Sequence, residues 1–207
     1  MKSSLKTLLV LGSVLMSSPL FAQQTSAASA APVQTATAIF AGGCFWCVEA
    51  DFEKLPGVVA AESGYTGGKT VNPTYEQTNT GNTGHTEAVR IIYDPTKVSY
   101  AALLDHFWKN IDPTVKNQQF CDVGSQYRSA LFYQNEAEKK AIEESKTAIL
   151  KEGRVKKIHT EIAPATTFYP AEEYHQDYYK KNPVRYNYYR ASCGRDRRLA
   201  NIWGKAN

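Results

Sequence analysis

Residues 37–55 have the sequence TAIFAGGCFWCVEADFEKL, and the hydrophobic pattern changes at its two glycines. The residues before the glycines are almost all apolar, which is typical of a short buried strand. After them, apolar side chains stand at positions 45, 48, 52 and 55, a helical spacing that Pro56-Gly57 ends. This stretch therefore predicts a buried strand that passes through a glycine turn directly into a helix.

Further strands and helices alternate irregularly after this stretch. The predicted strands are 58–65, 87–93, 128–133 and 158–162, and the predicted helices are 99–112, 136–151 with Asn135 as N-cap, and a short one near 171–180. Polar residues fill 69–84 and 114–126, which predicts two long loops. The pattern favours a two-layer α+β sandwich, with helices packed on a mainly antiparallel or mixed sheet, long loops and an irregular C-terminal tail.

The sequence of the first 36 residues predicts a cleaved export signal and a leader rather than part of the folded domain. Lys2 and Lys6 precede a short apolar run that Gly12 interrupts and Ala22 follows. This pattern is typical of a cleaved secretory signal peptide and is too short for a transmembrane helix. Residues 23–36 are uncharged and rich in Ala, Ser, Thr and Gln. We expect a signal peptide at 1–22, a flexible leader at 23–36 and a single folded domain at 37–207, exported to the periplasm or secreted, without stable membrane insertion after cleavage.

The charge balance argues against nucleic-acid binding. The chain has 24 Lys and Arg against 20 Asp and Glu, and two of the lysines leave with the predicted signal peptide. Nucleic-acid binding needs a clustered basic face, whereas the local excess consists of Arg190, Arg195, Arg197 and Arg198 near the C-terminus. We interpret these arginines as part of a solvated tail.

Cys44 begins the predicted helix directly after the glycine turn. Unpaired N–H groups at a helix N-terminus favour an anion, so we expect a lowered pKa and a nucleophilic thiolate at Cys44. Cys47 follows one turn later, and a Cys-x-x-Cys pair at a helix start is typical of redox-active proteins. The other two cysteines and the four histidines lack the spacing of a zinc site, so we expect no metal.

Six segments, the first of which lies in the stretch quoted above, follow one another along the chain: GGCFWCVE (42–49), SGYTGG (63–68), NPTYEQT (72–78), GHTEAV (84–89), QFCDVGSQYRS (119–129) and FYPAEEYHQDYY (168–179). Together they resemble the peptide methionine sulfoxide reductase A family over nearly the whole chain from residue 38 to about 204. One GCFW segment would not be specific, but six segments in the family's order are.

The resemblance implies an enzyme that reduces the S epimer of methionine sulfoxide, free or within polypeptides. Cys44 matches the nucleophile that attacks the sulfoxide sulfur, and Glu87 matches the acid that protonates the oxygen. Glu87 opens an apolar strand, where burial can keep its carboxyl protonated near neutral pH. We interpret the matching Tyr174-His175 as packing and hydrogen bonding.

The resemblance also assigns the substrate pocket. Phe45 and Trp46 match the aromatic pocket for the substrate methyl group. Tyr75 and Tyr127 match tyrosines that hydrogen-bond the sulfoxide oxygen. Asp122 matches a polar residue that helps to order water and the acid.

The implied cycle uses no metal or organic cofactor. A sulfenic acid on Cys44 condenses with a second thiol, and an external thioredoxin-like dithiol reduces the resulting disulfide. The second thiol stays open between Cys47, Cys193 and Cys121. We favour Cys47, one helical turn away, over Cys193, whose polar segment can swing towards Cys44, and a relay through both is a further alternative.

An alternative function uses the same Cys-x-x-Cys pair. A thioredoxin-like thiol–disulfide oxidoreductase needs no sulfoxide pocket, so turnover of a methyl sulfoxide with dithiothreitol distinguishes the two functions. In either case we expect a monomer.

Overall fold

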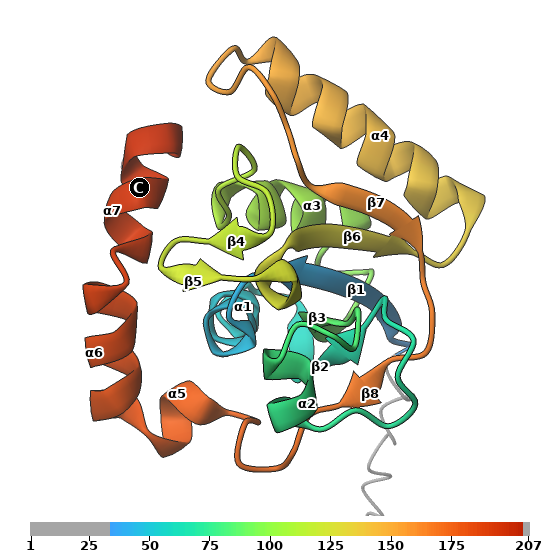
Figure 1. The fold of residues 1–207 in the computed structure, drawn as a ribbon. Coiled ribbons are helices and arrows are strands. Elements are labelled where there is room, and N and C mark those ends of the chain that lie inside the picture. The colour runs from blue at the N-terminus through green and yellow to red at the C-terminus, as the bar shows by residue number, and fades with distance from the viewer. Residues whose placement is uncertain (1–33, 205–207) are drawn as a thin grey trace, which may run out of the picture. The chain divides into compact units, whose positions relative to one another are not determined.

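The computed structural model describes residues 34–204, and a six-stranded sheet forms the centre of this part of the chain (Figure 1). Its strands are β1 (Ala36–Gly42), β2 (Val58–Thr66), β3 (Thr86–Tyr93), β6 (Ser129–Tyr133), β7 (Glu161–Pro164) and β8 (Tyr169–Pro170). The strand order is β7-β6-β1-β3-β2-β8, and neighbours are antiparallel except the parallel β6 and β7. The expected signal peptide and most of the expected leader lie outside the described residues.

Three helices bury the main core against one face of this sheet. They are α1 (Phe45–Glu53), α3 (Tyr100–Lys109) and α4 (Glu136–Lys151). Successive residues of β1 face opposite sides: Phe40 packs under the helices, and Ile39 packs in a smaller cluster on the other face with Phe168. The predicted α+β sandwich with a mixed sheet is confirmed. None of the helices in residues 34–204 has the length and apolarity needed to cross a membrane.

The two predicted long loops contain short elements of their own. Residues 69–84 include α2 (Tyr75–Asn79), which begins with a capping box between Thr74 and Gln77. Residues 114–126 include a small hairpin of β4 (Gln118–Gln119) and β5 (Asp122–Val123), followed by a 3₁₀ turn, η1 (Ser125–Tyr127). These short elements fix side chains that a mobile loop would leave free.

The prediction of an irregular, solvated C-terminal tail is wrong. The tail forms α5 (Tyr178–Lys181), α6 (Pro183–Ser192) and α7 (Arg195–Trp203), which follow one another along one side of the fold in Figure 1. Arg190 Nη1 lies 2.9 Å from Asp51 Oδ1. Arg195 is 2% exposed and donates to the Asn110 carbonyl oxygen at 2.6 Å. Arg190 and Arg195 therefore anchor the tail, because their partners come from distant parts of the chain, whereas Arg197 is exposed as expected.

Candidate active site

Cys44 is the N-cap of α1. Its carbonyl oxygen accepts the backbone N–H groups of Cys47 and Val48 at 3.1 and 3.3 Å, while its side chain makes no capping hydrogen bond. The preceding Gly43 has a φ of +86°, and a Cβ there would lie 2.5 Å from the Gln119 Cβ. Glycine is therefore required at this turn, which places the thiol at the start of the helix as predicted.

Strand β3 brings Glu87 to the same helix N-terminus. Its Oε2 accepts the Phe45 N–H at 2.9 Å, and the residue is 2% exposed. Burial raises the pKa of Glu87 to about 8 despite the Phe45 hydrogen bond, and the charge of Asp122 adds to the increase. The carboxyl is therefore mostly protonated at neutral pH, as expected of a proton donor.

The two aromatic residues after Cys44 are held in fixed orientations. The Trp46 ring stacks on Tyr178 with 3.7 Å between centroids, and Trp46 Nε1 donates to His175 Nδ1 at 3.0 Å. Phe45 is 1% exposed, and its ring centroid lies 4.9 Å from that of His175. His175 thus has the packing and hydrogen-bonding position expected from the sequence, and the rings form a rigid apolar wall.

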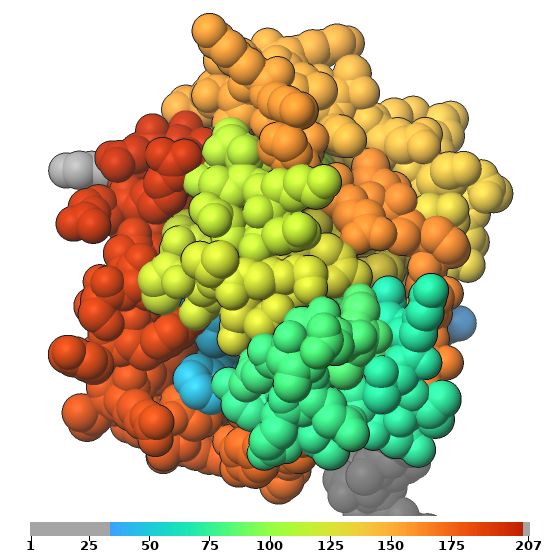
Figure 2. Space-filling view, viewed as in Figure 1, coloured from blue at the N-terminus to red at the C-terminus, as the bar shows by residue number. Residues whose placement is uncertain are grey.

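A cavity of about 60 Å³ lies beside Cys44. In Figure 2 a small blue area, part of the segment that contains α1, is visible at the surface. It lies between the green segment around α2, the yellow segment around β5 and the orange C-terminal segment. The volume equals that of roughly two water molecules, so it admits only the end of a side chain. Its lining brings together the expected catalytic and pocket residues and one other: Cys44, Phe45, Trp46, Tyr75, Glu87, Asp122, Tyr127 and Tyr189.

Tyr75 and Tyr127 reach the cavity from the two segments that the sequence predicted to be long loops, through α2 and η1 respectively. The Tyr75 N–H donates to Glu172 Oε1 at 2.8 Å, and its ring stacks near Phe45. The Tyr127 hydroxyl donates to Asn79 Oδ1 at 3.3 Å. Burial raises the pKa of both tyrosines, so both remain hydrogen-bond donors at physiological pH.

Tyr189 of α6 is the site residue that the sequence analysis missed. Its hydroxyl donates to Asp122 Oδ2 at 2.5 Å, and its side chain lines the same cavity as Cys44. Its ring meets Trp46 edge-on at 5.9 Å between centroids. Among 13 tyrosines in the chain, nothing in the local pattern around Tyr189 distinguishes it.

We expect Tyr189→Phe to slow methionine formation about tenfold, because the hydrogen bond from the Tyr189 hydroxyl to Asp122, in the cavity beside Cys44, is lost. The measurement is the rate of a single turnover, in which product release and thiol recycling play no part. Tyr188→Phe is the matched control, since Tyr188 is the preceding residue and is 76% exposed. Equal rates for the two variants would show that the Tyr189 hydroxyl only fills space.

The expected low pKa of Cys44 is not what the structure indicates. Burial raises the pKa of Cys44 well above its ordinary value, and the neighbouring Cys47 and Glu87 raise it further. The pKa of Cys47 is instead lowered to about 7, first by a hydrogen bond from Cys44 and then by Arg195 and Arg190. The difference comes first from burial at Cys44 and from the hydrogen bond that Cys44 gives to Cys47, and then from the cations of α6 and α7, which act on Cys47.

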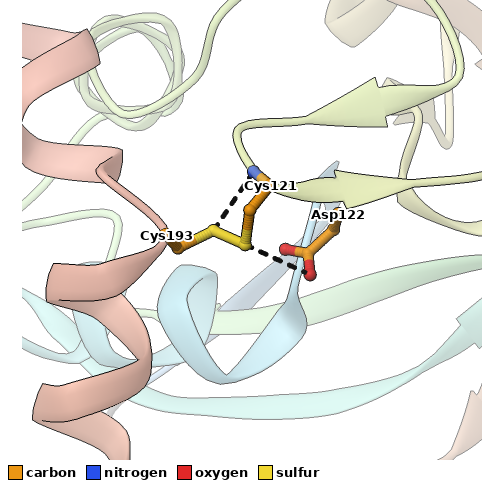
Figure 3. A group of neighbouring side chains, drawn as sticks. All are labelled: Cys121, Asp122 and Cys193. Atoms are coloured by element: carbon orange, nitrogen blue, oxygen red, sulfur yellow. Dashed lines mark hydrogen bonds between the residues drawn. A yellow bond between two sulfur atoms is a disulfide. The ribbon is translucent and has the colours of Figure 1, made fainter.

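Cys121 and Cys193 form a disulfide across 72 residues, which joins the β4–β5 turn to the junction of α6 and α7 (Figure 3). Cys44 and Cys47 are free and buried. The expectation that Cys193 swings on a loose segment is wrong, because this disulfide and the two helices hold it. Cys121, Asp122 and Cys193 also gather potential metal ligands within 4.8 Å, but their sulfurs are used in the disulfide.

Comparison with known proteins gives one consistent family. Residues 36–207 match the family model described as Peptide methionine sulfoxide reductase. The chain is 50% identical over 180 residues to Peptide methionine sulfoxide reductase MsrA 2 of Caulobacter vibrioides, covering 87% of this chain and 91% of the relative. It is 51% identical over 169 residues to the MsrA of Bacillus licheniformis, covering 81% and 93%.

Solved structures agree with the sequence relatives. Mxr1 from Saccharomyces cerevisiae in reduced form is similar with a TM-score of 0.69 and 35% identity, covering 75% of this chain and 90% of that one. Methionine sulfoxide reductase A of Corynebacterium diphtheriae has a TM-score of 0.65 and 37% identity, covering 74% and 77%. The thiol, the protonated carboxyl and the aromatic wall thus occur in a chain that belongs to the peptide methionine sulfoxide reductase family, and its reaction is the thiol-dependent reduction of methionine sulfoxide.

Proposed function

We propose that this chain reduces the S epimer of methionine sulfoxide, free or within proteins, with Cys44 as the nucleophile and Glu87 as the proton donor. The observation that carries the proposal is a buried thiol and a buried, protonated carboxyl that line one cavity of about 60 Å³. Phe45 and Trp46 supply an apolar wall for the substrate methyl group.

The chemical step follows from these positions. Cys44 gives its thiol proton to the Cys47 thiolate, to which it donates a hydrogen bond. The Cys44 thiolate formed in this way attacks the sulfoxide sulfur, and Glu87 gives its proton to the sulfoxide oxygen. The hydroxyls of Tyr75 and Tyr127 donate hydrogen bonds to that oxygen as charge develops on it. The S–O bond breaks, the hydroxyl group passes to Cys44, and methionine leaves, so Cys44 becomes a sulfenic acid and the substrate sulfur is reduced.

Cys47 is the thiol that we expect to resolve the sulfenic acid. Its pKa of about 7 gives a substantial thiolate fraction at neutral pH, and its thiol already hydrogen-bonds Cys44. Attack of the Cys47 sulfur on the Cys44 sulfur forms a disulfide and releases the hydroxyl group as water after protonation. The alternative is a relay in which Cys47 takes the first bond and Cys193 the second before the external dithiol acts.

An external thioredoxin-like dithiol then restores the two thiols. Mxr1 of Saccharomyces cerevisiae has also been solved in complex with Trx2, which supports a partner of this class. The signal-peptide pattern of residues 1–22 supports a periplasmic or secreted enzyme. We propose that this enzyme acts as a monomer. A cytosolic thioredoxin does not reach that compartment, so we place the reductant there or in a membrane relay.

The alternative, a general thiol–disulfide oxidoreductase, fits the site less well. Such a protein must present its attacking thiol to a partner's disulfide. Cys44 is 6% exposed and Cys47 is 2% exposed, and the surrounding cavity is too small for a protein segment that carries a disulfide.

The test is a single turnover, without added reductant, of purified enzyme in which Cys44 and Cys47 are free thiols. We expect one equivalent of methionine from the S sulfoxide, none from the R sulfoxide, and a Cys44–Cys47 disulfide in the peptide map. Cys47→Ser should still form one methionine but leave a persistent sulfenic acid, which a dimedone-type reagent traps. Formation of a Cys44 disulfide at the parent's rate in Cys47→Ser would show that another thiol resolves it.

A further inference from the structure

The four cysteines form two pairs that differ in their access to solvent. The inner pair, Cys44 and Cys47, is 6% and 2% exposed. The outer pair is the disulfide, in which Cys121 is exposed and Cys193 is half-buried. A thiol in solution can therefore reach the outer pair without any opening of the fold, whereas the inner pair is shielded.

A groove of about 360 Å³ lies against the outer pair. Cys193 forms part of its lining, and the Phe120 ring supplies an apolar surface. Apart from Val115 and Gly194, the rest of the lining is polar or charged: Asp112, Gln118, Arg197, Arg198 and Asn201. This volume is at the lower end of the range for small-molecule sites, so the groove suits a ligand of a few carbon atoms up to a short peptide.

The charge in the groove is not balanced. Arg198 Nε lies 2.7 Å from Asp112 Oδ2, so these two charges neutralise each other. Arg197 is exposed and makes no ion pair or side-chain hydrogen bond with another residue of 34–204. A Cβ at Gly194 would lie 3.1 Å from Arg197 Nη2, which places this guanidinium beside the residue that follows Cys193. A free guanidinium next to a disulfide favours a carboxylate on the molecule that approaches the sulfur.

The nearest acidic side chain, Asp122, lies at the Cys121 end of the disulfide, where its Oδ1 is 3.8 Å from Cys121 Sγ (Figure 3). Burial raises the pKa of Asp122, and the opposite charge of Arg195 works against that increase, so this carboxyl faces a cation of its own. Arg195 also lies beneath the groove, with its guanidinium 4.5 Å from the centroid of the Phe120 ring.

We propose that this groove binds a small thiol that carries a carboxylate, and that this thiol reduces the Cys121–Cys193 disulfide. The proposal concerns a second site and goes beyond the reduction of methionine sulfoxide. It holds or fails independently of the roles of Cys44 and Glu87, because its step involves only the outer pair.

The reaction is an ordinary thiol–disulfide exchange in two steps. The thiolate of the bound molecule attacks Cys193 Sγ, a mixed disulfide forms there, and Cys121 leaves as a thiolate that takes a proton from water. A second molecule of the same thiol then attacks the small-molecule sulfur of the mixed disulfide. This attack releases the disulfide of the two small thiols and the Cys193 thiolate. Two thiols are oxidised and one protein disulfide is reduced. The Cys121 N–H, 3.2 Å from Cys193 Sγ, stabilises that thiolate.

The experiment compares three small thiols on the air-oxidised, full-length mature enzyme: anionic 3-mercaptopropionate, neutral 2-mercaptoethanol and cationic cysteamine. Acid quenching, alkylation and peptide mass mapping count the free Cys121 and Cys193 at each time, and rates are expressed per thiolate. We expect 3-mercaptopropionate to react about fivefold faster than 2-mercaptoethanol, with a rate that saturates, and cysteamine to react slowest.

Variants of Arg197 test the source of the preference. Arg197→Ala should remove the advantage of 3-mercaptopropionate, Arg197→Lys should keep part of it, and Arg197→Glu should make cysteamine the fastest thiol. Arg185→Ala is the matched control, because Arg185 is an exposed arginine of α6 outside the groove and its loss changes the net charge equally. Equal rates per thiolate for all three thiols, the same loss in Arg185→Ala as in Arg197→Ala, or free Cys121 and Cys193 in the oxidised enzyme would each overturn the proposal.

Discussion

Cys44→Ser is expected to abolish methionine sulfoxide reduction, with residual activity well below about a tenth of the parent enzyme. A serine hydroxyl is far less ionised than a thiol and is a weaker nucleophile towards sulfur. It also cannot form the sulfenic acid that carries the oxygen away from the substrate. The measurement is methionine formed from the S sulfoxide, both in a single turnover and with excess dithiothreitol.

The fold of this variant should be intact, which makes the result interpretable. Cys44 is the N-cap of α1 and makes no side-chain capping hydrogen bond, and serine is among the preferred N-cap residues. We therefore expect the urea midpoint of Cys44→Ser to equal or exceed that of the parent. An active variant with this unchanged stability would remove Cys44 from the role of nucleophile.

Much of the fold could be predicted because it depends on local pattern. The strand, glycine turn and helix around Cys44 appear with boundaries close to those expected, and α4 begins after Asn135, whose Oδ1 accepts the Glu138 N–H at 2.9 Å. The resemblance also assigned residues that do line one cavity, including Glu87 with its raised pKa. Local periodicity and ordered segments are the signals that a single sequence carries well.

The parts that could not be predicted depend on contacts between distant segments. A lowered pKa at Cys44 follows from the helix N-terminus alone, but the structure adds burial and places two arginines from α6 and α7 beside Cys47 instead. The Cys121–Cys193 disulfide joins residues 72 apart, and spacing does not determine the pairing of four cysteines. Tyr189 meets Asp122 only because that same disulfide and the helical tail bring α6 against the β4–β5 turn.

Glu87→Gln is the second change with a large expected effect. The glutamine oxygen can still accept the Phe45 N–H, so the start of α1 should stay in place, but the amide has no acidic proton to give to the sulfoxide oxygen. We expect the rate of methionine formation in a single turnover to fall by roughly 10²–10⁴. Glu76→Gln is the matched control, because Glu76 lies nearby on α2 and is exposed, and its rate should stay within about twofold of the parent.

The pH dependence separates loss of a proton donor from a general disturbance of the site. The thiol pair loses its first proton, from Cys47, at a pKa of about 7, so the anion that activates Cys44 is largely formed before the pH reaches 8. The active form of Glu87 is the protonated one, and its raised pKa is about 8, so the single-turnover rate of the parent should fall as the pH rises through 8. In Glu87→Gln this fall should disappear, because the amide does not titrate, and the remaining pH dependence should come from the thiols, which gain thiolate as the pH rises. A parent rate that stays constant from pH 7 to well above 8, or a Glu87→Gln variant that keeps the alkaline fall, would mean that another group delivers the proton. The comparison does not depend on the absolute rates, since it uses only the shape of each profile.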